Sequence, residues 1–249
     1  MRRLAADLHI HTALSPCGDD DMTPPAIVAA ALRLGLAMIA VCDHNTAGNV
    51  AATQRAADGT GLAVIPGIEI TTAEEIHVLG LFPDAGAALA VGADVLATLP
   101  RASQADPAQA ARFGEQKLLG SAGEDLGRET RLLFAASGFG LEGAVGLIHG
   151  HQGLAVASHV DRPTMSVIAQ LGFFPPDVPF DAVEVSPAGV AAGRAAQFER
   201  LGLPILCGSD GHRLSDLGAG CTMCEMADAT FGELALAVRG AGGRRCRYA

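Results

Sequence analysis

The sequence predicts an α/β protein whose strands form a closed or nearly closed (β/α) barrel. Short apolar runs recur along the chain, amphipathic helical patterns separate several of them, and most runs end in polar residues. Strands that alternate with helices favour βαβ units and a parallel sheet. With about seven such runs, a closed or nearly closed barrel is favoured over an open sheet. The 249 residues, 49% of them hydrophobic, suffice for a single domain spanning 1–249.

The strand candidates share a short stretch of aliphatic residues. In chain order they are 3–12, 36–45, 62–71, 76–82, 154–161, 181–187 and 204–212. Helical patterns are expected at 24–35, 46–58, 128–151, 187–201 and 230–240. The first helix should begin after Thr23 as N-cap, because Pro24 suits the first helical position, where its missing N–H costs nothing.

Residues 101–127 interrupt this alternation. The segment is polar, rich in Gly and Ala, and contains no strand candidate. We expect an insertion with one helix around 107–119, which forms either a surface excursion or a lid over the site.

The composition argues against several classes of protein. A formal net charge of -10 and a pI near 5.1 oppose general binding to a nucleic-acid backbone. No apolar stretch reaches the ~18 residues of a membrane span, and a polar run follows Arg2 and Arg3 where a signal peptide would be apolar. We therefore expect a cytoplasmic enzyme with no membrane partner and reduced cysteines. No pattern indicates an oligomeric state.

Polar side chains cluster where the predicted strands end. In a parallel barrel these ends share one face, on which reacting groups gather. His9 and His11 are two residues apart on one strand, so they project to the same side and could bind one ion. A lone HxH motif is often only a solvated pair of histidines, and an Asp-His motif can be an Asx turn. Glu69 is harder to explain, because a carboxylate inside an apolar strand is costly unless paired or metal-bound.

The ordered set of motifs resembles the PHP family, named for polymerase and histidinol phosphatase. The family pattern is HxH, DH, Glu, His, His and DxH. The matching residues here are 9–11, 43–44, Glu69, His77, His159 and 210–212. The resemblance implies a distorted (β/α)7 barrel of the PHP type, a site with two or three divalent metal ions (zinc, manganese or iron), and hydrolysis of a phosphoester by a metal-bound hydroxide.

The resemblance also implies which side chains bind each metal. The first metal is assigned to His9, His11, Glu69 and Asp210. Glu69 bridges to a second metal, which is assigned to His77 and His159. The third is assigned to His44 and His212. Many relatives place an Asp or His shortly after HxH as a further ligand; here Cys17 stands there, ahead of Asp19. A thiolate would favour zinc or iron over manganese.

Other residues are assigned roles around the metals. Asp43 is expected to orient a ligand imidazole, and Asp43 or Asp210 to shuttle a proton. Arg162 and Arg213 directly follow ligand motifs and are candidates for binding phosphate oxygens, or else surface salt bridges. The expected substrate is a small phosphorylated molecule or a nucleotide. Two alternatives stay open: hydrolysis of a C–N or C–O bond, as in related barrels, and a non-catalytic metal-binding module.

Overall fold

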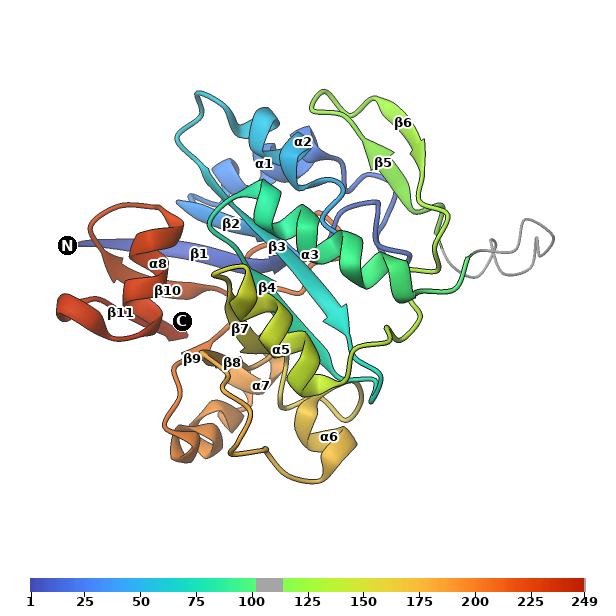
Figure 1. Ribbon diagram of the computed structural model, residues 1–249. Helices are drawn as coiled ribbons and strands as arrows, with labels where there is room; N and C mark the ends of the chain where they lie inside the picture. The colour runs from blue at the N-terminus through green and yellow to red at the C-terminus, as the bar shows by residue number, and fades with distance from the viewer. Residues whose placement is uncertain (102–113, 249) are drawn as a thin grey trace.

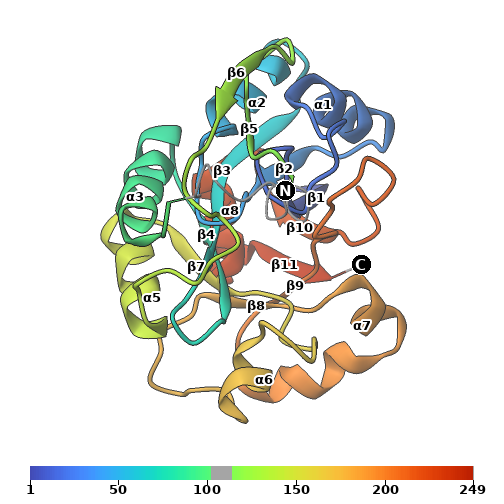
Figure 2. The same ribbon diagram turned by 90° about the vertical axis from the view of Figure 1, so that its right-hand side faces the viewer.

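Residues 1–101 and 114–248 are described by a computed structural model, shown in Figure 1. Within them the main sheet has the strand order β11-β10-β1-β2-β3-β4-β7-β8-β9 and curves into a nearly closed barrel (Figure 2). The strands at the predicted runs are β1 (Arg2–Ile10), β2 (Met38–Val41), β3 (Ala63–Thr71), β4 (His77–Leu81), β7 (Leu154–Ala157), β8 (Ala182–Glu184) and β9 (Ile205–Leu206). The predicted α/β barrel is confirmed.

Among the seven strands at the predicted runs, one runs against the others. β1, β2 and β3 are parallel, as are β7, β8 and β9, but β4 is antiparallel to both β3 and β7. β3 and β4 form a hairpin in which Thr71 pairs with His77. The start of β4 therefore lies at the edge where the parallel strands end, which brings His77 to the same face as the other motif residues.

Two strands without a sequence signal extend the sheet. β10 (Thr222–Met226) lies antiparallel to β1, and β11 (Arg245–Tyr248) lies antiparallel to β10. At the other end of β1, Gly211 N donates to the His9 carbonyl (3.3 Å) and His11 N donates to the Gly211 carbonyl (3.0 Å). This pairing closes the barrel at the site and places residues 210–212 beside 9–11.

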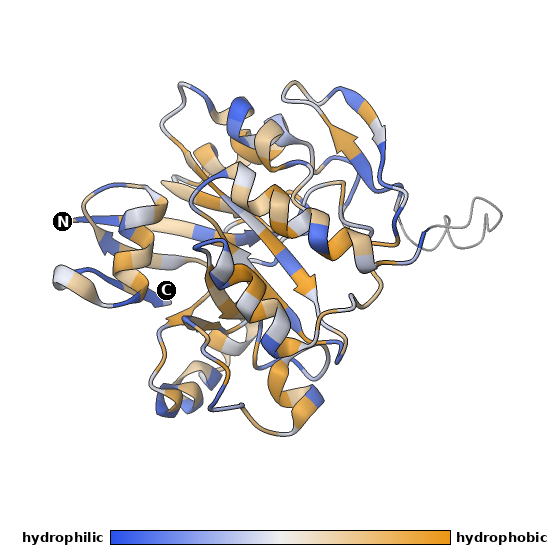
Figure 3. Ribbon diagram, in the orientation of Figure 1, coloured by the Kyte–Doolittle hydropathy of each residue, from blue (hydrophilic) through white to orange (hydrophobic). Residues whose placement is uncertain are grey.

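Most of the helices cover the outside of the barrel (Figures 1 and 3), whereas the helix 231–238 lies across one end of it (Figure 2). The helices are α1 (Pro24–Arg33), α2 (Val50–Ala57), α3 (Ala85–Thr98), α5 (Leu141–Gly150), α6 (Val167–Leu171), α7 (Pro187–Ala191), η1 (Arg194–Leu201), α8 (Phe231–Val238) and η2 (Ala241–Gly243). One apolar cluster lies between sheet and helices, and a second fills the barrel, where Leu8 and Met38 meet Leu234 of α8. No described helix is both long and apolar enough to cross a bilayer.

The predicted insertion is partly a hairpin. Residues 107–113 of the expected helix lie outside the described residues, and 117–119 form a strand instead. β5 (Lys117–Leu119) pairs with β6 (Asp125–Arg128) in a separate two-stranded sheet. The buried Asn49 amide donates to the Lys117 carbonyl (3.0 Å) and accepts from Leu119 N (2.9 Å). Hydrogen bonds from a distant helix thus hold this strand, which explains why its own sequence does not predict it.

Candidate metal centre

The imidazoles of His9 and His11, at the end of β1, point toward the same place. His9 and His11 are fully buried, and their Nε2 atoms lie 3.1 Å apart. The nearest carboxylate oxygen is Asp210 Oδ1, at 3.3 Å from His9 Nε2 and 3.0 Å from His11 Nε2. The two side chains project to the same side, as predicted. The pairing of residues 9–11 with Gly211 brings the Asp210 carboxylate beside them.

Glu69 lies at the centre of the cluster and is almost fully buried. Its Oε1 is 3.0 Å from His77 Nδ1, 3.3 Å from His159 Nε2 and 3.4 Å from His9 Nε2. Its Oε2 is 3.0 Å from His44 Nδ1 and 3.5 Å from His11 Nε2. Burial alone would raise the pKa of the carboxyl, but the surrounding imidazoles hold that pKa well below its ordinary value.

Asp210 completes one side of the site. Burial opposes its ionisation, but His9 and His11 keep its pKa well below the usual range. Its second oxygen, Oδ2, accepts from the Arg162 guanidinium at 2.5 Å. Asp210 (φ 50°) and His159 (φ 26°) both have left-handed backbone conformations, which are costly for such residues and tend to occur at functional sites.

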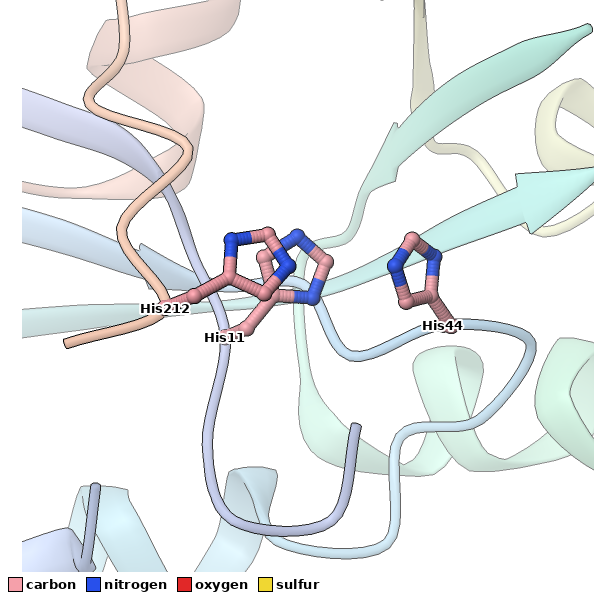
Figure 4. A group of neighbouring side chains, drawn as sticks. All are labelled: His11, His44 and His212. Carbon is pink, nitrogen blue, oxygen red and sulfur yellow. The ribbon is translucent and has the colours of Figure 1, made fainter. Parts of the chain in front are cut away.

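A second group of imidazoles lies beside the first, as Figure 4 shows for His11, His44 and His212. The His11 ring stacks on His212 with centroids 4.1 Å apart and lies 4.5 Å from His44. The thiol of Cys17, a residue with an exposed surface, interacts with both His212 and His44. Burial of the thiol group opposes ionisation, but these imidazoles lower its pKa to about 7. Asp19 instead pairs with Arg213 at the surface (3.3 Å).

The arrangement fits divalent cations. Among the described residues, six buried side-chain atoms lack a hydrogen-bond partner: His44 Nδ1, Glu69 Oε2, His77 Nδ1, Ser158 Oγ, His159 Nδ1 and Asp210 Oδ1. Four of them, on His44, Glu69, His77 and Asp210, are atoms that meet within the cluster. Four ligand atoms bound at ~2.1 Å around one ion lie about 3.4 Å from one another. The separations of 3.0–3.5 Å around His9 and His11 match that spacing. Buried polar atoms left unpaired at this spacing are explained by bound cations.

Within residues 1–101 and 114–248, three sets of side chains have ligand atoms close enough to share an ion. They are His9 with His11, Glu69 and Asp210; His44 with Glu69 and His77; and His11 with His44 and His212. The first set is the one assigned from the resemblance. In the second, His44 stands where His159 was assigned, although His159 Nε2 also reaches Glu69. The third adds His11 to the assigned pair.

Glu184 is a site residue that the sequence analysis missed. It lies at the end of β8, buried, and accepts from His9 Nδ1 at 2.9 Å and from His159 N at 3.2 Å. This bond places the His9 proton on Nδ1 and turns the free Nε2 toward the cluster. The missed signal was a carboxylate inside an apolar strand, the same feature that identified Glu69. Gly208 makes the fit possible, since an added Cβ would be 2.6 Å from the Glu184 carboxylate.

Asp43 lies behind the ligands. It is fully buried and accepts from Thr12 N (2.7 Å), Thr12 Oγ1 (2.8 Å) and Ser15 Oγ (2.7 Å). Because the Ser15 hydroxyl donates its proton to Asp43, its oxygen accepts from His11 Nδ1 (2.8 Å). Asp43 therefore contacts His11 through Ser15, and the His11 Nε2 lone pair is left facing the cluster.

The two arginines assigned to phosphate binding differ in position. Arg162 contacts Asp210 and lines a hollow of about 470 Å³ together with Arg194, Ser186 and Ser209. Arg213 is largely exposed and pairs with Asp19 on the surface. Arg162 is thus the arginine that adjoins the metal cluster.

The chain is similar to several nucleases and hydrolases. It is 39% identical over 80 residues, 30% of its length, to the 5'-3' exoribonuclease Rnm of Escherichia coli (strain K12). The match spans only 26% of that relative. The structure resembles endonuclease Q in complex with a 27-mer duplex substrate (TM-score 0.69, 19% identity, 98% of this chain and 58% of that one). It also resembles a protein of Bifidobacterium adolescentis classed as a metal-dependent phosphoesterase (TM-score 0.56, 21% identity, 83% and 87% covered).

The expectation of a small phosphorylated substrate, with nucleic-acid binding disfavoured, is wrong. One relative is an exoribonuclease, and the endonuclease holds a 27-mer duplex substrate with an abasic lesion at its active site. The expectation used the net charge of the whole chain, whereas binding depends on the local field, which bound cations and clustered arginines can reverse. Residues 7–170 match the PHP domain model, and this match joins HxH, DH, Glu69, His77 and His159 in one segment. The chain therefore belongs to the PHP domain family.

Proposed function

We propose that the chain is a metal-dependent nuclease that hydrolyses phosphodiester bonds of RNA. The observation that carries the proposal is the ring of imidazoles around Glu69, several of whose buried nitrogen and oxygen atoms have no hydrogen-bond partner among the described residues. The similarity to an exoribonuclease supports RNA as the substrate, and the folds of the two phosphoester-cleaving neighbours agree with this class of reaction.

We assign two or three divalent ions to the cluster. His9, His11, Glu69 and Asp210 hold the first ion. Glu69 and His77 share the second, together with His44 or His159. The remaining imidazoles near Cys17 hold the third, and a thiolate there favours zinc or iron over manganese. Such ions polarise phosphoryl oxygens and lower the pKa of water, which supplies a nucleophile at neutral pH.

The protein side chains position the substrate and the ligands. The Arg162 guanidinium has donors beyond the one that binds Asp210, and these are placed to grip a phosphate oxygen beside the cluster. Asp210 Oδ2 lies at the same edge and is the candidate to accept a proton. Asp43 fixes the His11 tautomer through Ser15, so we assign it an orienting role and not the proton shuttle.

An activity screen tests the proposal. The purified chain is loaded separately with manganese, iron and zinc and given a 20-nucleotide RNA, the DNA of the same sequence, bis-p-nitrophenyl phosphate, and a set of amides and lactones. We expect RNA cleavage that is abolished by EDTA and by E69Q. The matched control E142Q changes an exposed glutamate of α5 and should leave cleavage intact.

Two results would contradict the proposal. Turnover of amides or lactones without cleavage of any phosphodiester would identify a C–N or C–O hydrolase. No hydrolysis at all, while metal raises the melting temperature, would identify a non-catalytic metal-binding module.

A further inference from the structure

The two ends of the described chain bring arginines together. Arg2 and Arg3 open β1, and Arg244, Arg245 and Arg247 lie in or next to β11. β10 pairs with both strands, so these segments are joined in one antiparallel extension of the sheet, where Figure 1 marks both termini. A chain with a net charge of -10 thus concentrates positive charge at one place.

Strand alternation sorts these arginines by face. Glu225 of β10 pairs with Arg3 on one side and with Arg245 on the other. Arg247 is two residues along from Arg245 and therefore projects to the same side. Cys224 and Cys246 point to the opposite, inner side, where their sulfurs meet at 2.9 Å. We call Arg3, Glu225, Arg245 and Arg247 the basic face.

The charges on the basic face do not cancel. Arg245 binds the Glu225 carboxylate at 2.7 Å. Arg3, Arg245 and Arg247 are exposed, and Arg3 and Arg247 form no ion pair with any residue of the described part. The pKa of Glu225 is lowered by its hydrogen bond from Arg245 and further by the charges of Arg3 and Arg247. Three guanidinium groups therefore face one carboxylate, which leaves two positive charges in excess.

A hollow adjoins the basic face. It has a volume of about 510 Å³ and is lined by Arg247, by Cys246 and Tyr248 from the other side of β11, and by Glu199, Leu203 and Ile205. A basic surface that contacts the phosphate backbone is one of the means by which proteins bind single-stranded nucleic acid.

We propose that the basic face binds the phosphate backbone of single-stranded RNA at a distance from the metal centre. The inference rests on the proposed nuclease function and extends it to substrate length. Arg3 and His9 are six residues apart on β1, which corresponds to about 20 Å. A dinucleotide has a single phosphodiester, so it cannot contact both places at once, whereas a 20-mer can. Long RNA gains affinity from the face, and a dinucleotide does not.

A triple variant, R3Q/R245Q/R247Q, tests this. The control R33Q/R55Q/R200Q removes the same charge from exposed positions on α1, α2 and η1. Binding of a fluorescein-labelled 20-nucleotide oligouridylate is measured by anisotropy in EDTA, with circular dichroism as a check on folding. Cleavage of the 20-mer and of an RNA dinucleotide is then measured with metal.

Three phosphate contacts lower the slope of log K against log salt by about two. We expect the salt dependence of the triple variant to be shallower by about two in this slope, and its binding of the 20-mer to be about tenfold weaker at low salt. The control should bind like wild type. The KM for the 20-mer should rise, with dinucleotide cleavage unchanged. Unchanged 20-mer affinity and salt slope in the triple variant, or an equal loss in the control, would overturn the inference and leave the nuclease proposal intact. RNA binding through the face without any cleavage would instead reject the nuclease proposal.

Discussion

Replacing Glu184 should weaken metal binding although this residue binds no metal itself. In E184A the buried donors His9 Nδ1 and His159 N both lose their acceptor. His9 is then free to rotate or to change tautomer, and its Nε2 no longer faces Glu69 and Asp210. E184Q keeps an oxygen that can accept from His9 but removes the negative charge that makes the imidazole a better ligand.

The size of the effect follows from these two bonds. Loss of a residue that orients a metal ligand costs 10–100-fold in metal affinity, or about 1.4–2.8 kcal/mol. Each buried donor left without an acceptor costs roughly 1–3 kcal/mol, so metal-free E184A should lose about 2–6 kcal/mol in its free energy of unfolding. We expect both the metal affinity and the free energy of unfolding to decrease in the order wild type, E184Q, E184A.

Metal affinity is measured by competition with a fluorescent chelator, and stability by urea denaturation in EDTA. E225Q is the control, because it removes a partly exposed carboxylate from β10, far along β1 from the cluster. If E184A bound zinc or manganese as tightly as wild type while remaining folded, the assignment of Glu184 as the residue that positions His9 would be refuted.

Three further predictions concern single sites. G208A should destabilise the protein by about 1–3 kcal/mol and weaken metal binding, because the new Cβ would lie 2.6 Å from the Glu184 carboxylate and 2.7 Å from the His9 Cβ. Urea denaturation measures the loss of stability, and chelator competition measures the loss of metal affinity. The hydrogen bonds from Arg244 lower the pKa of Glu233 from 4.5 to about 2. The pair therefore stabilises the fold above pH ~4.5, and this contribution is lost as the pH falls toward 2. The difference in free energy of unfolding between wild type and E233Q should shrink over that range. The Cys224 and Cys246 sulfurs, 2.9 Å apart on paired strands, should form a disulfide when oxidised glutathione is added. Mass spectrometry without reductant detects the disulfide as a loss of two hydrogens, and this loss should be absent in C246S.

The parts of the fold that were predicted are those with local signals. The apolar runs identified the strands of the barrel, and motifs at their ends placed the ligands on one face, because strand direction and side-chain alternation are properties of short segments. His77 is instructive, since it begins its strand. It joins the site only because β4 runs antiparallel, and strand direction depends on which neighbours a strand finds in the folded chain.

The parts that were not predicted depend on distant partners. β10 and β11 have mixed sequences and pair only once β1 offers an edge, and β5 is held by the amide of Asn49. Glu184 has no motif around it, and its role becomes visible only when His9, 175 residues away, lies beside it. The substrate class was mispredicted because net charge is an average over the chain, whereas a substrate meets the local field at the surface it contacts.

The most direct test of the account is an anomalous diffraction measurement on crystals of the chain grown with zinc or manganese. We predict a strong anomalous peak bounded by His9, His11, Glu69 and Asp210, with a second on the His77 side of Glu69. Crystals of the folded, metal-treated chain that show these side chains and no anomalous peak among them would contradict the central claim that they converge to bind divalent ions.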